Sequence, residues 1–211
     1  VISAQRRLLY PREEWAGGHA NSAPTVAKNQ VLVEYTAHPD AAFHLWDGLL
    51  VPVADVVDAS SDVARPVAPA LQRVTLRTVE SSTKQRVATK LHVHGAWGEY
   101  LTPLDRHRIP NPAWFEDYST DFVGWPNIRE EDDGPHLCTY IDGETVIDLP
   151  LGTVYVEITK GFEIKPVRTV VEIGPDTDEV VIELERVLPW RKRGWVTADT
   201  HVHFLSPMTA L

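Results

Sequence analysis

The chain lacks several features that define common classes of protein. Cys138 is the only cysteine among 211 residues, so no disulfide can form within the chain, which favours a reducing compartment. No apolar run approaches the ~20 residues that a membrane-spanning helix needs. The formal net charge of −10 provides no overall basic field that would attract nucleic acid or anionic lipid. We therefore expect a soluble protein that binds neither nucleic acid nor a membrane, and the single cysteine favours the cytoplasm without fixing the location.

The familiar motifs of nucleophilic and phosphate chemistry are also missing. The sequence has no G-x-S-x-G turn, no phosphate-binding glycine loop and no C-x-x-C pair, and each of these would mark a specific chemistry. Cys138 lies in the apolar run 137–141, where a cysteine usually serves as a small buried hydrophobe. The acidic run 130–133 lacks the spaced alternation of a calcium-binding loop. We expect it to be a solvated loop surface.

Helical periodicity is absent, and short alternating segments take its place. Val74, Leu76 and Thr78 fall on one face of an extended segment. Further segments of this kind cover 137–141, 145–149, 153–159, 167–173 and 180–184, with turn residues between them. The pairs Asp47-Gly48 and Asp142-Gly143 are strong hairpin signals, because both residue types tolerate positive φ. The pattern predicts an all-β, antiparallel β-sandwich.

The same pattern divides the chain into three parts. Residues 1–30 read as a polar connector with one short helix around 11–15, residues 31–190 as the sandwich, and residues 191–211 as the start of another domain. We expect the first strand at 31–36. A hairpin follows, with its returning strand at 49–53 and then a loop over 55–69.

A long irregular insertion interrupts the predicted sandwich at 103–136. Loops longer than about 15 residues are usually functional or disordered. Five aromatic residues argue against disorder. These residues are Trp114, Phe115, Tyr118, Phe122 and Trp125. Trp114, Phe115, Tyr118 and Trp125 favour a segment packed on the sheet, with a platform for a sugar or another ligand as the alternative.

The sharpest chemical signal is the run Asp199-Thr200-His201-Val202-His203. On a strand, alternate side chains share a face, so Asp199, His201 and His203 project together with neighbours roughly 6.5 Å apart. Two imidazoles at that distance can converge on a divalent metal ion. The spacing alone is weak evidence, because His92-Val93-His94 has it too. That second pair follows Lys90 rather than a carboxylate, and we expect a partly exposed strand face there.

The run from Gly194-Trp195 to His203 resembles the opening motif of metal-dependent hydrolases of the polymerase-and-histidinol-phosphatase (PHP) type, closest to their carbaryl-hydrolase-like branch. The resemblance implies that His201 and His203 bind a metal, whether zinc, manganese or iron. It also implies that Asp199 either binds the metal or orients a histidine. In this family the motif lies on the first strand of a catalytic barrel, and the remaining ligands lie on later strands.

A looser resemblance covers residues 140–161. Tyr140-Ile141-Asp142-Gly143, the Leu149-Pro150-Leu151-Gly152 turn and the Val154–Gly161 strand are similar to the carboxypeptidase-regulatory, transthyretin-like β-sandwich. Such a sandwich precedes the barrel in some of these hydrolases. The chain starts at Val1 and continues for only a few residues beyond the motif. We therefore expect a fragment: an accessory sandwich followed by the first strand of a truncated barrel domain.

These resemblances imply a function for the parent protein. It would hydrolyse an ester, amide, carbamate or phosphoester with metal-bound hydroxide, and the fragment by itself would be inactive because two histidines leave a catalytic metal short of ligands. Its partner would be the remainder of the hydrolase domain. The alternative from the residues is a non-catalytic binding module for carbohydrate or a protein partner. A third possibility is a scaffold that covers or dimerises the catalytic domain.

Overall fold

The computed structural model describes residues 3–10, 24–35, 38–58, 61–105, 108–109, 118–119, 122–123 and 137–198. The strands are β1 (Ser3–Leu9), β2 (Thr25–Glu34), β3 (Ala42–His44), β4 (Leu50–Pro52), β5 (Ala70–Glu80), β6 (Thr89–Gly95), β7 (Arg108–Ile109), β8 (Tyr118–Ser119), β9 (Phe122–Val123), β10 (Leu137–Ile141), β11 (Glu144–Pro150), β12 (Gly152–Thr159), β13 (Val167–Ile173) and β14 (Glu179–Leu184). The helical elements are α2 (Val53–Val57) and the 3-10 turn η1 (Arg191–Arg193).

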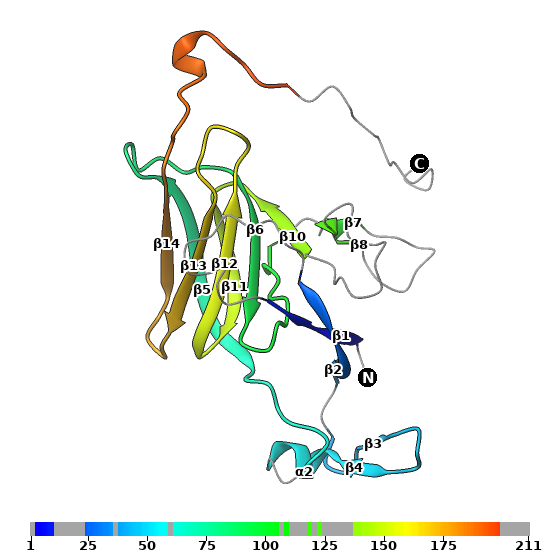
Figure 1. Ribbon diagram of the computed structural model, residues 1–211. Helices are drawn as coiled ribbons and strands as arrows, with labels where there is room; N and C mark the ends of the chain where they lie inside the picture. The colour runs from blue at the N-terminus through cyan, green and yellow to red at the C-terminus, as the bar shows by residue number, and fades with distance from the viewer. Residues whose placement is uncertain are drawn as a thin grey trace, which may run out of the picture.

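Two sheets form the body of the molecule (Figure 1). One has five strands in the order β13-β12-β6-β10-β9, and the other has three in the order β11-β5-β14. A single apolar cluster joins them, with Val74, Ile147 and Leu184 from the smaller sheet and Val93 and Val156 from the larger one, each at most 1% exposed. The predicted all-β, sandwich-like fold is therefore confirmed. None of the described sheets closes into a barrel.

Alternation along β5 explains how the smaller sheet faces the core. Val74, Leu76 and Thr78 have no exposed surface, as the sequence predicts. On the opposite face, Arg73 Nε lies 3.0 Å from Asp148 Oδ1 on the neighbouring strand β11. Arg77 forms an ion pair with Glu144 in the same way. Among the described strands, every pair is antiparallel except β5–β14, which is parallel.

The two predicted Asp-Gly turns are present. Gly48 joins β3 to β4 with φ +86°, and Gly143 joins β10 to β11 with φ +108°. A Cβ at Gly143 would lie 3.0 Å from the backbone nitrogen of Val87. Both the backbone conformation and the close approach therefore require glycine at position 143.

The first thirty residues contain more structure than a connector. Strand β1 pairs antiparallel with β2, from Ser3 opposite Glu34 to Leu9 opposite Thr25. The strand expected at 31–36 is thus the second half of a longer strand that begins at Thr25. The alternation rule missed β1 because its sequence, SAQRRLL, has no regular apolar period. The helix expected around 11–15 lies outside the described residues.

A second difference concerns the segment after β4. The returning strand ends at Pro52, and Val53–Val57 form a short helix where a strand end and a loop are expected. Val53 and Val56 are its buried residues, so the two valines anchor one turn of helix. Figure 1 shows α2, β3 and β4 as a small group away from the two sheets.

The chain leaves the sandwich after β14. Residues 185–198 contain no strand, only η1, and extend beyond the ends of the sheets in Figure 1. Trp195 and Val196 are 64% and 84% exposed there. Among the described residues, no helix has the length and apolar character needed to cross a bilayer.

Candidate functional site

The three predicted metal-binding residues, Asp199, His201 and His203, lie outside the described residues. The structure follows the chain up to Ala198, the residue directly before the motif. The described residues therefore include the end of the sandwich that leads to the motif, but not the motif itself. The acidic run 130–133 and the aromatic residues Trp114, Phe115 and Trp125 also lie outside the described part, and Tyr118 and Phe122 are described by their backbone alone.

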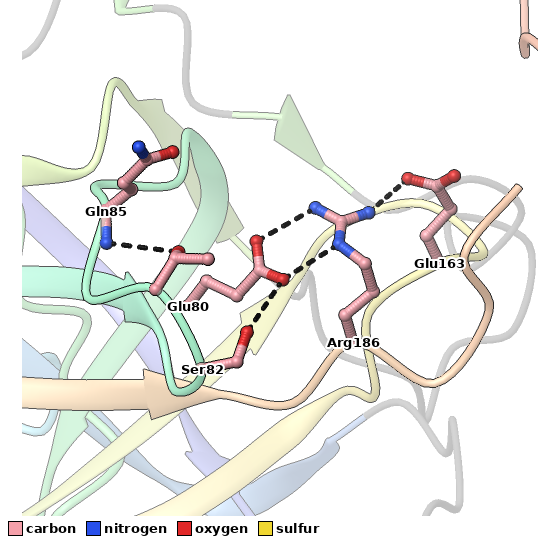
Figure 2. Close-up of polar contacts among 6 residues, drawn as sticks. Glu80, Ser82, Gln85, Glu163 and Arg186 are labelled. Carbon is pink, nitrogen blue, oxygen red and sulfur yellow. Dashed lines mark hydrogen bonds and ion pairs between the residues drawn. The ribbon is translucent and has the colours of Figure 1, made fainter. Parts of the chain in front are cut away.

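Arg186 fixes the point where the chain leaves the sandwich (Figure 2). Its Nε lies 3.1 Å from Oε1 of Glu80 at the end of β5, and its Nη2 lies 3.3 Å from Oε2 of the same carboxylate. Its Nη1 donates to Glu163 in the loop between β12 and β13. Ser82 Oγ also donates to Glu80 Oε1, over 3.3 Å. The Arg186 guanidinium thus joins the end of β5 and the β12–β13 loop to the segment that follows β14.

The electrostatics of this clamp favour its charged form. The hydrogen bond from Arg186 holds the pKa of the Glu80 carboxyl below its ordinary value. Reciprocally, the hydrogen bond to Glu80 raises the pKa of Arg186. The side chains of Glu80 and Glu163 are 16% and 20% exposed, so water screens these pairs less than it screens pairs on the open surface.

An apolar groove opens beside the clamp. It has a volume of about 540 Å³ and is lined by Phe162, Leu188, Trp190, Trp195, Val196 and Thr197. Trp190 and Trp195 meet edge to face, with ring centroids 6.5 Å apart. A second cavity of about 540 Å³ shares Phe162, Trp195 and Thr197 with it and contains Lys160 and Arg191. Nothing in the local sequence pattern predicts that the β12–β13 loop and residues 188–197 form one surface.

The second histidine pair lies elsewhere, on the outer face of the five-stranded sheet. His92 and His94 are each 2% exposed, so the prediction of a partly exposed strand face is wrong. Tyr10, directly after β1, stacks on His94 with ring centroids 3.8 Å apart. Tyr155 stacks on the same imidazole at 4.8 Å. Sequence reasoning missed this burial because the covering ring of Tyr10 comes from a distant part of the chain.

The two imidazoles contact each other directly. His92 Nε2 lies 2.9 Å from His94 Nδ1, and His92 Nδ1 contacts the carbonyl oxygen of Leu137. Glu157, opposite His92 on β12, forms an ion pair with Arg168. Burial, with a smaller effect of Glu157, raises the pKa of the Tyr10 phenol. No group of three or more potential ligands for a metal occurs among the described residues. Both imidazoles pack against the Tyr10 ring.

A smaller cavity of about 220 Å³ borders this cluster, between His94 and Trp97. Arg7 lies over the Trp97 ring, 4.5 Å from its centroid, and donates from Nε to the Trp97 carbonyl oxygen over 3.0 Å. These contacts attach β1 to the turn after β6. Cys138, on the neighbouring strand β10, is 1% exposed, which confirms its predicted role as a buried apolar residue.

No protein-family model, curated protein or solved structure matches this chain. The resemblances to PHP-type hydrolases and to transthyretin-like sandwiches therefore depend on the quoted residues alone.

Proposed function

We propose that the chain is the β-sandwich accessory domain of a metal-dependent hydrolase, followed by the opening strand of the catalytic domain. In the complete protein, His201 and His203 would bind a divalent metal together with ligands from later strands. Asp199 would bind the same metal or orient one histidine. A metal bound there would supply an activated water for attack on an ester, amide, carbamate or phosphoester.

The observation that carries the proposal is the separation between the core and the motif. Among the described residues, the members of the main apolar cluster lie between Val74 and Leu184, and Arg186 then clamps the exit from β14. The segment from Arg191 to Ala198 is exposed throughout. A described core that ends at β14, with an exposed segment leading from it to the motif, is the arrangement expected of an accessory domain placed before a catalytic one.

The test uses the full natural gene product, assayed against a panel of esters, amides, carbamates and phosphoesters. We expect hydrolysis to be lost on treatment with a chelator and restored by zinc, manganese or iron. His201→Ala and His203→Ala should each lower the bound metal and reduce kcat at least 100-fold, in line with the loss of a metal ligand. His44→Ala, which removes an exposed strand histidine, is the matched control and should retain full activity.

Two results would contradict the proposal. One is hydrolysis that persists unchanged in the chelated protein. The other is a double variant, His201→Ala with His203→Ala, that keeps wild-type metal content and activity. The 211-residue chain on its own should show no hydrolysis of the same panel.

A further inference from the structure

The groove beside the Arg186 clamp has the form of a small-molecule site. Its volume of about 540 Å³ lies within the range of roughly 300–1,000 Å³ that such sites occupy. Three apolar side chains in its wall are strongly exposed: Phe162 at 82%, Trp195 at 64% and Val196 at 84%. Apolar side chains gathered at one place on a surface mark a binding site more often than scattered ones do.

Cationic side chains line the cavity that adjoins the groove. Lys160 and Arg191 line the adjoining cavity, which shares Phe162 and Trp195 with the groove. Two further arginines there are already neutralised, Arg186 by Glu80 and Glu163, and Arg86 by Glu144.

Lys160 and Arg191 differ from those arginines because neither forms an ion pair with a carboxylate in the described part of the chain. Arg191 also begins the run Arg191-Lys192-Arg193, in a chain whose net charge is −10. The positive potential at this point is therefore a local feature, opposite in sign to the rest of the molecule.

We infer that these two adjoining cavities bind a small amphiphilic anion, a molecule with an acyl or aromatic body and one carboxylate or phosphate group. The apolar body would lie between Phe162 and Trp195, and the anionic group would lie near Lys160 and Arg191. The chemistry of the walls carries this assignment, because an uncharged apolar ligand would leave the cations unused and a simple anion would leave the aromatic rings exposed.

A single soluble molecule fits this surface better than a bilayer does. The walls come from two separate segments, the β12–β13 loop and residues 188–197, and they enclose a concavity. Trp190 is half-buried and meets Trp195 edge to face. The formal net charge of −10 also opposes attraction of the molecule to an anionic bilayer. The inference uses neither His201 nor His203 nor a metal, so its test is separate from the test of the proposed hydrolase function.

The test titrates the 211-residue chain with dodecanoate below its micelle concentration, followed by calorimetry and tryptophan fluorescence. We expect saturable binding with one site per chain. Trp195→Ala should weaken binding at least about tenfold, as loss of a buried aromatic anchor does. Lys160→Ala combined with Arg191→Ala should weaken it about thirtyfold, because about 1 kcal/mol for each cation near an anionic group sums to about 2 kcal/mol.

Matched controls distinguish binding at this site from nonspecific association of the amphiphile with exposed side chains. Trp46 is a fully exposed tryptophan on the β3–β4 hairpin, at 103%, and Lys28 is an exposed cation on β2. Trp46→Ala and Lys28→Ala should leave the dissociation constant unchanged, and circular dichroism should show every variant folded. Dodecyl phosphate should bind like dodecanoate, whereas dodecyltrimethylammonium should bind at least about tenfold more weakly.

Several results would overturn the inference. The first is no saturable binding of dodecanoate or dodecyl phosphate. The second is binding that Trp195→Ala leaves intact, and the third is equal affinity for the cationic amphiphile. Association with phosphatidylserine vesicles without binding of the monomeric anion would also overturn it, because the surface would then recognise a membrane.

Discussion

At the scale of single residues, Glu99 shows how burial opposes charge in this fold. Its carboxylate folds back over the turn after β6, where Oε2 accepts a hydrogen bond from the backbone nitrogen of Trp97 over 2.9 Å. Oε1 lies 1.8 Å from where a Cβ on Gly95 would be, so a side chain at that position would displace the Glu99 carboxylate. Burial raises the pKa of Glu99, although the hydrogen bonds and the nearby Arg7 act in the opposite direction. Relative to the unfolded chain, folding therefore shifts this carboxyl toward its protonated form.

The sign of this shift gives a pH-dependent prediction. A carboxyl whose pKa is raised on folding stabilises the protein below its unfolded pKa, about 4.3, and this contribution is lost as the pH rises through the folded value. Glu99→Gln stays neutral and keeps an acceptor for Trp97. We expect its thermal midpoint to exceed that of wild type by about 2 °C at pH 7 and to match it near pH 4. A difference of the same size at both pH values would contradict this account.

At the scale of elements, Arg186 holds together segments that the sheets leave separate. It joins β5 through Glu80 and the β12–β13 loop through Glu163, while the chain continues from it toward η1. Lys165 and Glu185 add a backbone hydrogen bond of 2.9 Å beside it. The walls of the proposed binding groove depend on this alignment, because Phe162 lies on one joined segment and Trp195 on the other.

Replacing Arg186 should therefore affect stability and the groove together. Arg186→Gln leaves two half-buried carboxylates without their cation, and we expect a loss of about 1–3 kcal/mol in the free energy of unfolding at pH 7. The pKa of Glu80 is lowered by Arg186, so this contribution is present above the unfolded pKa and is lost as the pH falls through the folded one. Urea unfolding at pH 7 and pH 3 measures it.

The control for Arg186 is an exposed ion pair. Arg73 is 69% exposed and pairs with Asp148, so Arg73→Gln should cost less than about 1 kcal/mol. Equal losses for the two variants, or a loss at Arg186 that is the same at both pH values, would show that the clamp does not stabilise the exit.

The elements also show what a sequence can predict. Strands β10 to β14 were predictable because apolar residues alternate along them and turn residues lie between them. Strand β1 was not, since its pairing with β2 depends on backbone hydrogen bonds that leave no apolar period. The burial of His92 and His94 under Tyr10, and the contact between Arg186 and Glu80, join residues far apart in the chain. Local patterns contain no information about such contacts.

At the scale of the whole molecule, the core defines which part of the chain folds as a unit. Its members extend from Val74 to Leu184 and come from both sheets. Within the described residues, the segment after Arg186 adds exposed side chains and a 3-10 turn but no member of the main apolar cluster. The stability of the sandwich should therefore be independent of the residues that carry the metal-binding motif.

This independence can be measured by truncation. Removing residues 195–211 deletes Asp199, His201 and His203 together with the exposed Trp195 and Val196. We expect the thermal midpoint to change by less than about 4 °C, equivalent to about 1 kcal/mol or less in a chain of this length. Removing residues 179–211 instead deletes β14, which supplies Ile182 and Leu184 to the core, and should abolish cooperative unfolding. If both truncations unfold the protein, the sandwich needs the segment that follows it, and the proposed division between accessory domain and catalytic strand is wrong.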